Sequence, residues 1–206
     1  MIDLPISEME KGFLKKAGEI AANSAADALS KLLGDRINID ITNCDKVETN
    51  VIPKMFGDDD KKVVAVNMLI PTKNLCTVLM LIPYEEAMKF CDMFSNREPG
   101  TTKEISYDQW SELFEIGNIS ICAYLNTLSN MIDEKLVPTP PAVAYDTVTS
   151  ILEDIAVSAD TVDNKAILIE TDFRLNDVKF NSHFIFIPDR DFANSILKIF
   201  NTSEKI

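Results

Sequence analysis

Two long stretches of the chain, one in each half, carry apolar residues at three- and four-residue spacing, which is typical of an amphipathic helix. The first covers residues 7–33 and is followed by Gly34, a frequent helix stop. The second covers residues 108–131. Their apolar stripes are Phe13, Leu14, Ala17, Ile20, Ala21, Ala25, Ala28 and Leu32, then Trp110, Leu113, Phe114, Gly117, Ile121, Leu125 and Leu128. The pattern therefore predicts two long helices.

Strand patterns follow each helix. Ile37, Ile39 and Ile41 alternate with polar residues, as in a half-buried strand. Four later segments are rich in β-branched and apolar residues: 61–70, 75–82, 166–173 and 178–187. We expect a turn at PTKN between the first two, from Pro71 to Asn74. Residues 51–60, with Pro53, Gly57 and the acidic run 58–60, are expected to form a loop.

The two halves resemble each other in sequence order. LIPYEEAMKFCDMF and FIPDRDFANSILKIF each join a strand end to a short helix through a proline, Pro83 and Pro188, about 105 residues apart. KKAGEI, beginning at Lys15, and FEIGNI, beginning at Phe114, lie 99 residues apart. A further amphipathic stretch covers residues 147–157. These matches indicate an internal duplication, with pseudo-repeats at 7–95 and 106–203.

The duplication predicts an α+β sandwich. Neither half can bury its apolar faces alone, so the strands of both should join into one antiparallel sheet with the long helices packed on it. We expect residues 1–206 to form a single domain of this kind. A chain of 206 residues can bury enough surface to be stable without disulfides or metals.

The net charge of the chain and its amino-terminal residues restrict the classes of partner and compartment that we expect. The chain has 33 acidic and 20 basic residues, a net charge of −13, which argues against nucleic acid and against anionic membrane surfaces. Asp3, Glu8 and Glu10 stand where a signal peptide would be basic and then apolar, so we expect a soluble, cytoplasmic protein.

The cysteines, Cys44, Cys76, Cys91 and Cys122, form no CxxC pair. We expect reduced thiols and no metal site.

One face of the second long helix combines polar side chains that could carry chemistry. Ser111, Glu115, Asn118 and Cys122 are spaced at i, i+4, i+7 and i+11, so they share one side of the helix. Pro141 follows Asn118 after 22 intervening residues. A carboxylate and a carboxamide are thus displayed together on a rigid element. By itself, such a pair is most often a solvated surface pair.

With that spacing, the chain resembles the CheC/CheX/FliY family of chemotaxis phosphatases, and within it the CheC proteins most closely. The family motif is Asp or Ser, three residues, Glu, two residues, Asn, 22 residues and Pro, and Ser111, Glu115, Asn118 and Pro141 match it. The helix-and-strand order and segments such as PTPPAVAYD, LIETDF and FIFIPD extend the resemblance along the whole chain.

The resemblance implies hydrolysis of the aspartyl phosphate of the response regulator CheY. Such a regulator brings its own divalent metal, so the helper protein need only position water, and we assign no cofactor to this chain. Asn118 can orient that water, because a carboxamide both donates and accepts hydrogen bonds. Glu115 would pair with a lysine of the regulator, and Pro141 would shape the backbone nearby.

CheC proteins usually carry the motif twice, but the first half of this chain has lost it. Gly12, Lys16 and Glu19 stand at the helix positions and Thr42 stands at the proline position. We therefore expect one active site. We expect Lys15, Lys16 and Glu19 to form a solvated face of the first helix, and the first half to be retained for architecture or for a partner.

Two other readings remain open. The same fold could bind the deamidase CheD or CheY as a non-catalytic adaptor, or could act as a flagellar switch component like the middle domain of FliM. The second of these gives no reason for the spacing of Glu115 and Asn118. Among the other candidates, His183 is expected to be a packed strand residue and Trp110 a core residue or an interface anchor.

Overall fold

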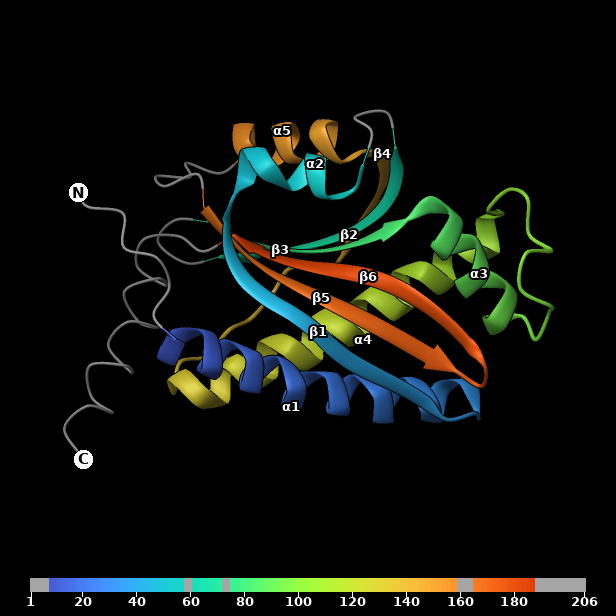
Figure 1. The fold of residues 1–206 in the computed structure, drawn as a ribbon, viewed down its shortest axis with the longest axis horizontal. Coiled ribbons are helices and arrows are strands. Elements are labelled where there is room, and N and C mark those ends of the chain that lie inside the picture. Colours follow the sequence, from blue (N-terminus) through green and yellow to red (C-terminus); the bar gives the residue numbers. More distant parts are fainter. Residues whose placement is uncertain (1–7, 58–60, 72–74, 159–164, 188–206) are drawn as a thin grey trace.

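The computed structural model describes residues 8–57, 61–71, 75–158 and 165–187 (Figure 1). In chain order, the elements are α1 (Glu8–Leu33), β1 (Ile37–Glu48), α2 (Ile52–Met55), β2 (Lys62–Pro71), β3 (Leu75–Pro83), α3 (Tyr84–Phe94), α4 (Tyr107–Ile132), β4 (Ala142–Thr147), α5 (Val148–Ser158), β5 (Lys165–Leu175) and β6 (Val178–Ile187). Both long helices and the predicted strands are present in this order. No helix in the described ranges is long and apolar enough to cross a membrane.

The six strands form one antiparallel sheet in the order β1-β5-β6-β3-β2-β4. Exchanging each strand with its counterpart in the other half, β1 with β4, β2 with β5 and β3 with β6, reverses this order without otherwise changing it. The two halves therefore meet at the β3–β6 pair and are related by a pseudo-twofold arrangement. The predicted α+β fold with an antiparallel sheet built from two similar halves is confirmed.

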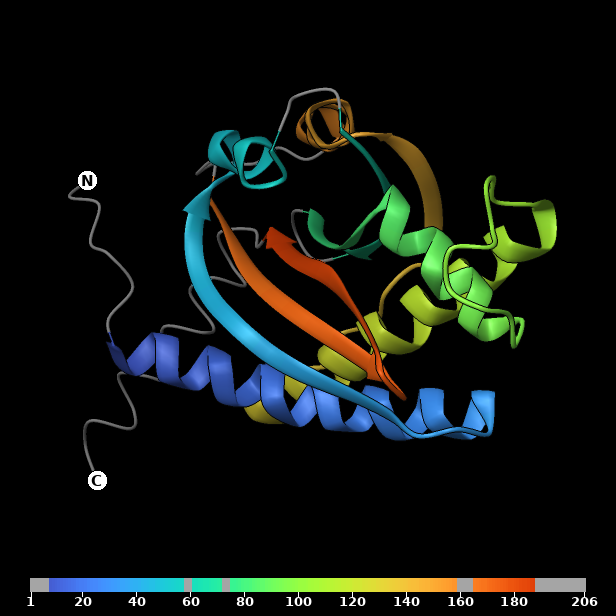
Figure 2. The ribbon, with the colours of Figure 1, turned by 45° about the vertical axis from the view of Figure 1, so that its right-hand side comes forward.

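Helices cover both faces of the sheet. The long helices α1 and α4 lie on one face, whereas the short helices α2 and α5 lie on the other (Figure 1, and Figure 2 from a second direction). The larger apolar core fills the space between the long helices and the sheet, and a smaller one lies beneath α2 and α5. Because both faces of the central strands are covered, β2 and β5 are buried along most of their lengths.

The structure contains two secondary-structure elements that the sequence did not predict. PTPPAVAYD contains an unpredicted strand, β4, because this short edge strand is half exposed and shows no clear alternation of buried side chains. The segment 51–60, expected to be a loop, contains the short helix α2, whose Ile52 is fully buried. The acidic run 58–60, residues 72–74 of the predicted turn and the predicted helix after Pro188 lie outside the described residues.

Candidate functional site

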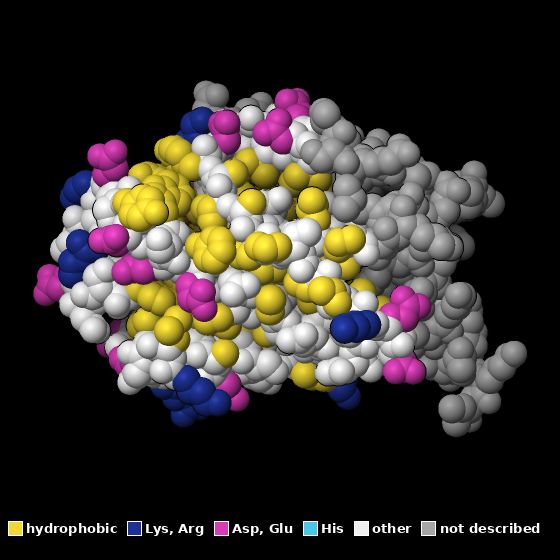
Figure 3. Space-filling model, turned by 180° about the vertical axis from the view of Figure 1, so that it is seen from behind, with side chains coloured by type: hydrophobic (Ala, Val, Ile, Leu, Met, Phe, Trp, Pro, Cys, Tyr) yellow, Lys and Arg dark blue, Asp and Glu magenta, His cyan; other side chains and the backbone are white. Residues whose placement is uncertain are grey.

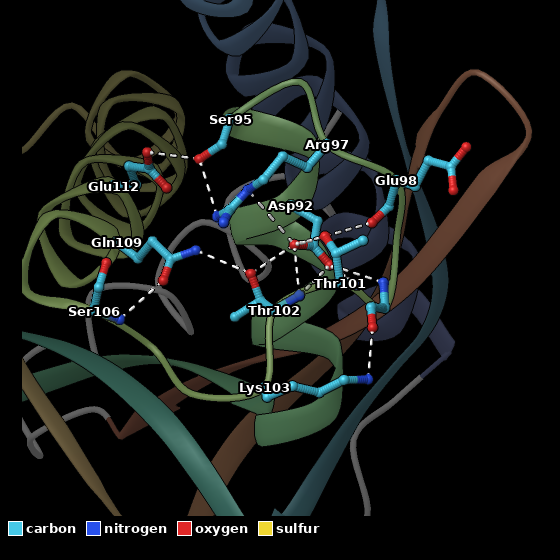
Figure 4. Close-up of polar contacts among 11 residues, drawn as sticks. Asp92, Ser95, Arg97, Glu98, Thr101, Thr102, Lys103, Ser106, Gln109 and Glu112 are labelled. Atoms are coloured by element: carbon cyan, nitrogen blue, oxygen red, sulfur yellow. Dashed lines mark hydrogen bonds and ion pairs between the residues drawn. The ribbon is translucent and has the colours of Figure 1, made fainter.

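The loop between α3 and α4 is organised around one buried carboxylate. Asp92, on α3, accepts hydrogen bonds from the backbone N–H groups of Gly100, Thr101 and Thr102 and from the hydroxyl groups of both threonines (Figure 4). Burial alone would raise the pKa of Asp92, but these hydrogen bonds outweigh it and hold the pKa below its ordinary value. The ionised carboxylate thereby fixes the loop from which α4 starts.

The first turn of α4 is tied to the same loop. Gln109 is buried and donates from Nε2 to Thr102 Oγ1 at 3.1 Å, while its Oε1 accepts from the N–H of Ser106 at 2.8 Å (Figure 4). The second bond satisfies a backbone donor at the helix entrance, where no intrahelical partner exists. A continuous hydrogen-bond path therefore joins Asp92 to the beginning of the predicted site helix.

The three helical residues of the motif lie together on the outer side of α4. Ser111 is exposed and Glu115 and Asn118 are half-buried, whereas Leu113 and Ile116 between them are fully buried toward the core. Within the described part of the chain, no hydrogen bond or ion pair holds the carboxylate of Glu115. The side chain can therefore reach a charged group on a partner.

A glycine brings this part of α4 unusually close to the sheet. A Cβ atom on Gly117 would lie 2.6 Å from the side-chain carbons of Val66 on β2, so no larger residue fits without a shift. Val66 pairs with Val143 of the edge strand β4. Asn118, the next residue, is thereby held at the level of the β2–β4 edge.

Pro141 lies at the start of that edge. The β2–β4 ladder ends at the pair Asn67–Ala142, and Pro141 has no N–H group to continue it. The chain nevertheless stays beside β2, because Thr139 exchanges two hydrogen bonds with Leu69, of 2.8 and 3.0 Å. Val143 of β4 packs against the core beneath α4, and Pro141 directly precedes this strand. Ser111, Glu115 and Asn118 thus lie on the outer side of α4, and Pro141 lies at the edge of the sheet beside β2.

Cys122 contacts the carboxamide of Asn118. Its Sγ donates to Asn118 Oδ1 at 3.6 Å, one helical turn away. Burial and the nearby charge of Glu115 raise the pKa of Cys122, so the thiol keeps the proton that it donates. This contact occupies the carboxamide oxygen on one side and orients the amide group of Asn118.

The polar side chains on this face of α4 are better suited to positioning a water molecule than to binding a metal ion. They supply one carboxylate, one carboxamide and one hydroxyl, spread over two helical turns. Among the described residues, no three His, Cys, Asp or Glu side chains are grouped so that they could hold a metal ion. The face can therefore orient a water molecule and pair with a cation, but it offers no ligand set of its own.

Comparisons with known proteins agree with this reading of the fold. The curated CheY-P phosphatase CheC of Bacillus subtilis (strain 168) is 22% identical over 190 residues, which is 90% of this chain and 91% of that protein. The chain also superposes on the crystal structure of Thermotoga maritima FliY with a TM-score of 0.78, at 17% identity and with 98% and 99% of the two chains covered. In sequence and in fold, the chain is therefore similar to members of the CheC/CheX/FliY family.

A second group of similar structures shares the fold. The middle domain of FliM from H. pylori superposes with a TM-score of 0.63, at 13% identity, over 94% of this chain and 99% of that one. No family model matches the sequence. The CheC-like fold is therefore common to proteins whose sequences have diverged widely.

The first half does not present the family motif. Gly12, Lys16 and Glu19 are all exposed on α1. Lys15 is exposed as well, which agrees with the prediction that Lys15, Lys16 and Glu19 form a solvated face. Thr42 lies at an irregularity in the β1–β5 ladder and donates a hydrogen bond to the carbonyl oxygen of Glu170. These residues offer no carboxamide and no arrangement like that of Glu115 and Asn118.

The remaining candidates lie apart from the CheC-family motif. His183 is a packed strand residue, as predicted: its ring lies 4.4 Å from that of Phe56 beneath α2, and burial lowers its pKa, so it stays neutral. Trp110 is half-buried and packs against the large core. All four cysteines are free thiols.

Sequence reasoning missed two features around the CheC-family motif. The Asp92 loop carries little signal, since an aspartate in an amphipathic helix is usually solvated; only the Thr101–Thr102 pair after Gly100 hints at hydroxyl donors. Tyr145 was missed because β4 was not predicted, so nothing placed this aromatic residue beside α4.

Proposed function

We propose that this CheC-family chemotaxis protein accelerates hydrolysis of the aspartyl phosphate of phosphorylated CheY, at a single site in its second half. The observation that carries the proposal is the match of Ser111, Glu115, Asn118 and Pro141 to the family spacing, with the three helical residues on the outer side of α4. The name of its Bacillus subtilis relative, a CheY-P phosphatase, supports the same activity.

In the proposed reaction, water attacks the phosphorus atom in line with the bond to the aspartyl oxygen. That bond breaks, giving inorganic phosphate and the free carboxylate of the regulator. Asn118 holds the water by hydrogen bonding, and Glu115 pairs with a lysine of the regulator to set the position of α4. The divalent metal belongs to the regulator, and we place the protein in the cytoplasm with this substrate.

Cys122 and Gly117 support Asn118 in this scheme. The thiol hydrogen bond restricts rotation of the carboxamide, and the close approach of Gly117 to Val66 fixes the backbone beside it. Fixing a group before the substrate arrives removes entropy that the reaction would otherwise lose, which is how positioning accelerates a step without covalent chemistry.

A second candidate is a non-catalytic adaptor that binds CheY or CheD. It is favoured by the solved complexes of FliM with FliG and with SpeE from H. pylori, in which chains of similar fold take part in protein assemblies. The adaptor would use the same fold but would not need Asn118.

Phosphate release from the phosphorylated CheY of the same organism tests the proposal. We expect a catalytic amount of this protein to accelerate release, with each molecule turning over many regulator molecules. Binding without acceleration would favour the adaptor and reject the phosphatase. Acceleration that survives Asn118→Ala would reject the assigned site.

A further inference from the structure

The exposed aromatic side chains of the described residues gather around the motif. Tyr107 is 86% exposed, Phe114 36% and Tyr145 46%, and all three lie on α4 or on the adjacent strand β4. The other large hydrophobic side chains exposed in the described ranges are aliphatic: Ile20, Leu32, Val51, Met55 and Val137. Aromatic residues, together with Met and Arg, are enriched in protein–protein interfaces.

Two of these aromatic residues lie on the same strip of α4 as Asn118. Phe114 precedes Asn118 by four residues and Tyr107 precedes it by eleven, so all three lie within about 40° of one another around the helix. Ser111 and Glu115 lie beside the same strip. A protein whose surface reaches Asn118 therefore also comes close to Phe114, one turn away.

The third aromatic residue extends this surface onto the sheet. The ring of Tyr145 on β4 lies 6.1 Å from that of Trp110 on α4 and 4.7 Å from that of Tyr84 at the start of α3. Figure 3 views the side of the molecule that carries α4 and β4, where hydrophobic side chains gather and charged ones stand mainly toward the margins. The aromatic side chains thus form a surface continuous with the motif.

The first half shows that the fold does not require these residues. Helices α1 and α4 occupy equivalent places, and at each of the four aromatic positions on this surface the residue 99 positions earlier is charged. Tyr107, Trp110, Phe114 and Tyr145 correspond to Glu8, Lys11, Lys15 and Lys46. The aromatic residues therefore accompany the motif, and the half without the motif lacks them.

We infer that Tyr107, Trp110, Phe114 and Tyr145 form an aromatic platform that docks an apolar patch next to the phosphoaspartate of the response regulator. This inference rests on the proposed function. With a net charge of −13, this protein gains little long-range attraction toward a regulator whose phosphorylation pocket is acidic. Apolar contact beside the reacting group would supply affinity that charge does not.

Direct binding and steady-state kinetics test the platform separately from the chemistry. Phe114→Lys and Tyr145→Lys introduce the residues that the first half carries at the equivalent positions, so the fold should tolerate them. Leu32→Lys, at an aliphatic residue of α1 that is 51% exposed, is the matched control for the added charge. The probe is the regulator loaded with magnesium and beryllofluoride, a stable analogue of the phosphoryl group.

We expect each platform variant to raise the Kd by about tenfold, as expected for a central aromatic contact, and to raise KM far more than it lowers kcat. Leu32→Lys should bind like the wild type. Asn118→Ala should show the opposite pattern, with kcat lowered and Kd within about twofold of the wild type.

The outcomes separate the two proposals. If both platform variants bind the regulator as tightly as the wild type does, the inferred docking platform is rejected, even if Asn118→Ala abolishes turnover. If they weaken binding while Asn118→Ala leaves turnover intact, the platform stands and the assigned catalytic site falls. Equal weakening by Leu32→Lys would show a general charge effect and would also reject the platform.

Discussion

The two long helices of this protein occupy equivalent places in a pseudo-symmetric fold, yet they present different chemistry to solvent. The outer face of α4 carries Glu115 and Asn118, whereas the equivalent positions of α1 carry Lys16 and Glu19. Both helices nevertheless pack a glycine toward the sheet, Gly117 on α4 and Gly18 on α1. The packing constraint has been kept in both halves and the chemistry in only one.

The two edge strands, β1 and β4, also differ at the position of the motif proline. Strand β1 pairs with β5 from Ile37 to Glu48, with one irregularity around Thr42. Strand β4 is only half as long and begins directly after Pro141, which stands where β1 has Thr42. Since a proline cannot donate to a ladder, this single position shortens the edge strand beside the motif. The duplicated fold has thus kept its core packing in both halves, whereas its surface residues have been free to diverge.

The largest effect is expected from removing the carboxamide that α4 carries and α1 lacks. Asn118→Ala should lower the stimulated release of phosphate by about a hundredfold, because a positioning group is lost while the fold remains. Glu19→Ala, at the matching position of α1, should leave the rate unchanged. Phosphate release with unaltered circular dichroism checks both, and a large loss in Glu19→Ala would show that the first half is also catalytic.

The next largest effect is expected on stability, at the loop between α3 and α4 that joins the two halves. Asp92→Asn should lower the free energy of unfolding by about 2–3 kcal/mol at neutral pH, since several buried donors lose a charged acceptor. The folded-state pKa of Asp92 is below its ordinary value, so its contribution is present above that value and is lost as the pH falls through the folded pKa.

Denaturant unfolding at neutral and acidic pH measures this contribution. The difference between wild type and Asp92→Asn should shrink below about pH 4, where ordinary carboxyl groups become protonated. Asp108→Asn, at an exposed acid in the first turn of α4, serves as the control and should change stability by less than about 1 kcal/mol. An equally large pH-dependent difference in this control would contradict the assignment to Asp92.

The two glycines should respond in opposite directions to the same substitution. Gly117→Ala should destabilise the protein by about 1–3 kcal/mol, because its Cβ would overlap the side chain of Val66. Gly18→Ala should stabilise it by about 0.5–1 kcal/mol, because its Cβ would meet Ile41 at an ordinary 3.4 Å and alanine favours the helix. Equal destabilisation in both variants, measured by thermal or denaturant unfolding, would contradict the packing difference.

The smallest effect is expected from moving the motif into the first half. In a chain that also carries Asn118→Ala, the substitutions Gly12→Ser, Lys16→Glu, Glu19→Asn and Thr42→Pro rebuild the spacing on α1. We expect phosphate release to stay within about threefold of the Asn118→Ala background, since α1 lacks the aromatic surroundings. Recovery to the wild-type rate would show that the four motif residues suffice.

Much of the fold was predictable because its signals are periodic. The long helices and the central strands follow from the spacing of apolar residues, and the family spacing from Ser111 to Pro141 was visible in the sequence. Strand β4 and helix α2 were not predicted, because both are short: β4 is a half-exposed edge strand, and α2 is a single turn of helix. At such positions, tertiary packing decides the conformation more than local pattern does.

The sequence by itself determined the duplication, the amphipathic helices and the spacing that relates this chain to the CheC/CheX/FliY family, since all three are properties of residue order. Only the tertiary structure decided that the segment around Pro141 runs beside β2, that Gly117 packs against Val66 and that Tyr145 lies beside Trp110. These contacts depend on strand order and helix placement, which bring together residues that are far apart in the chain.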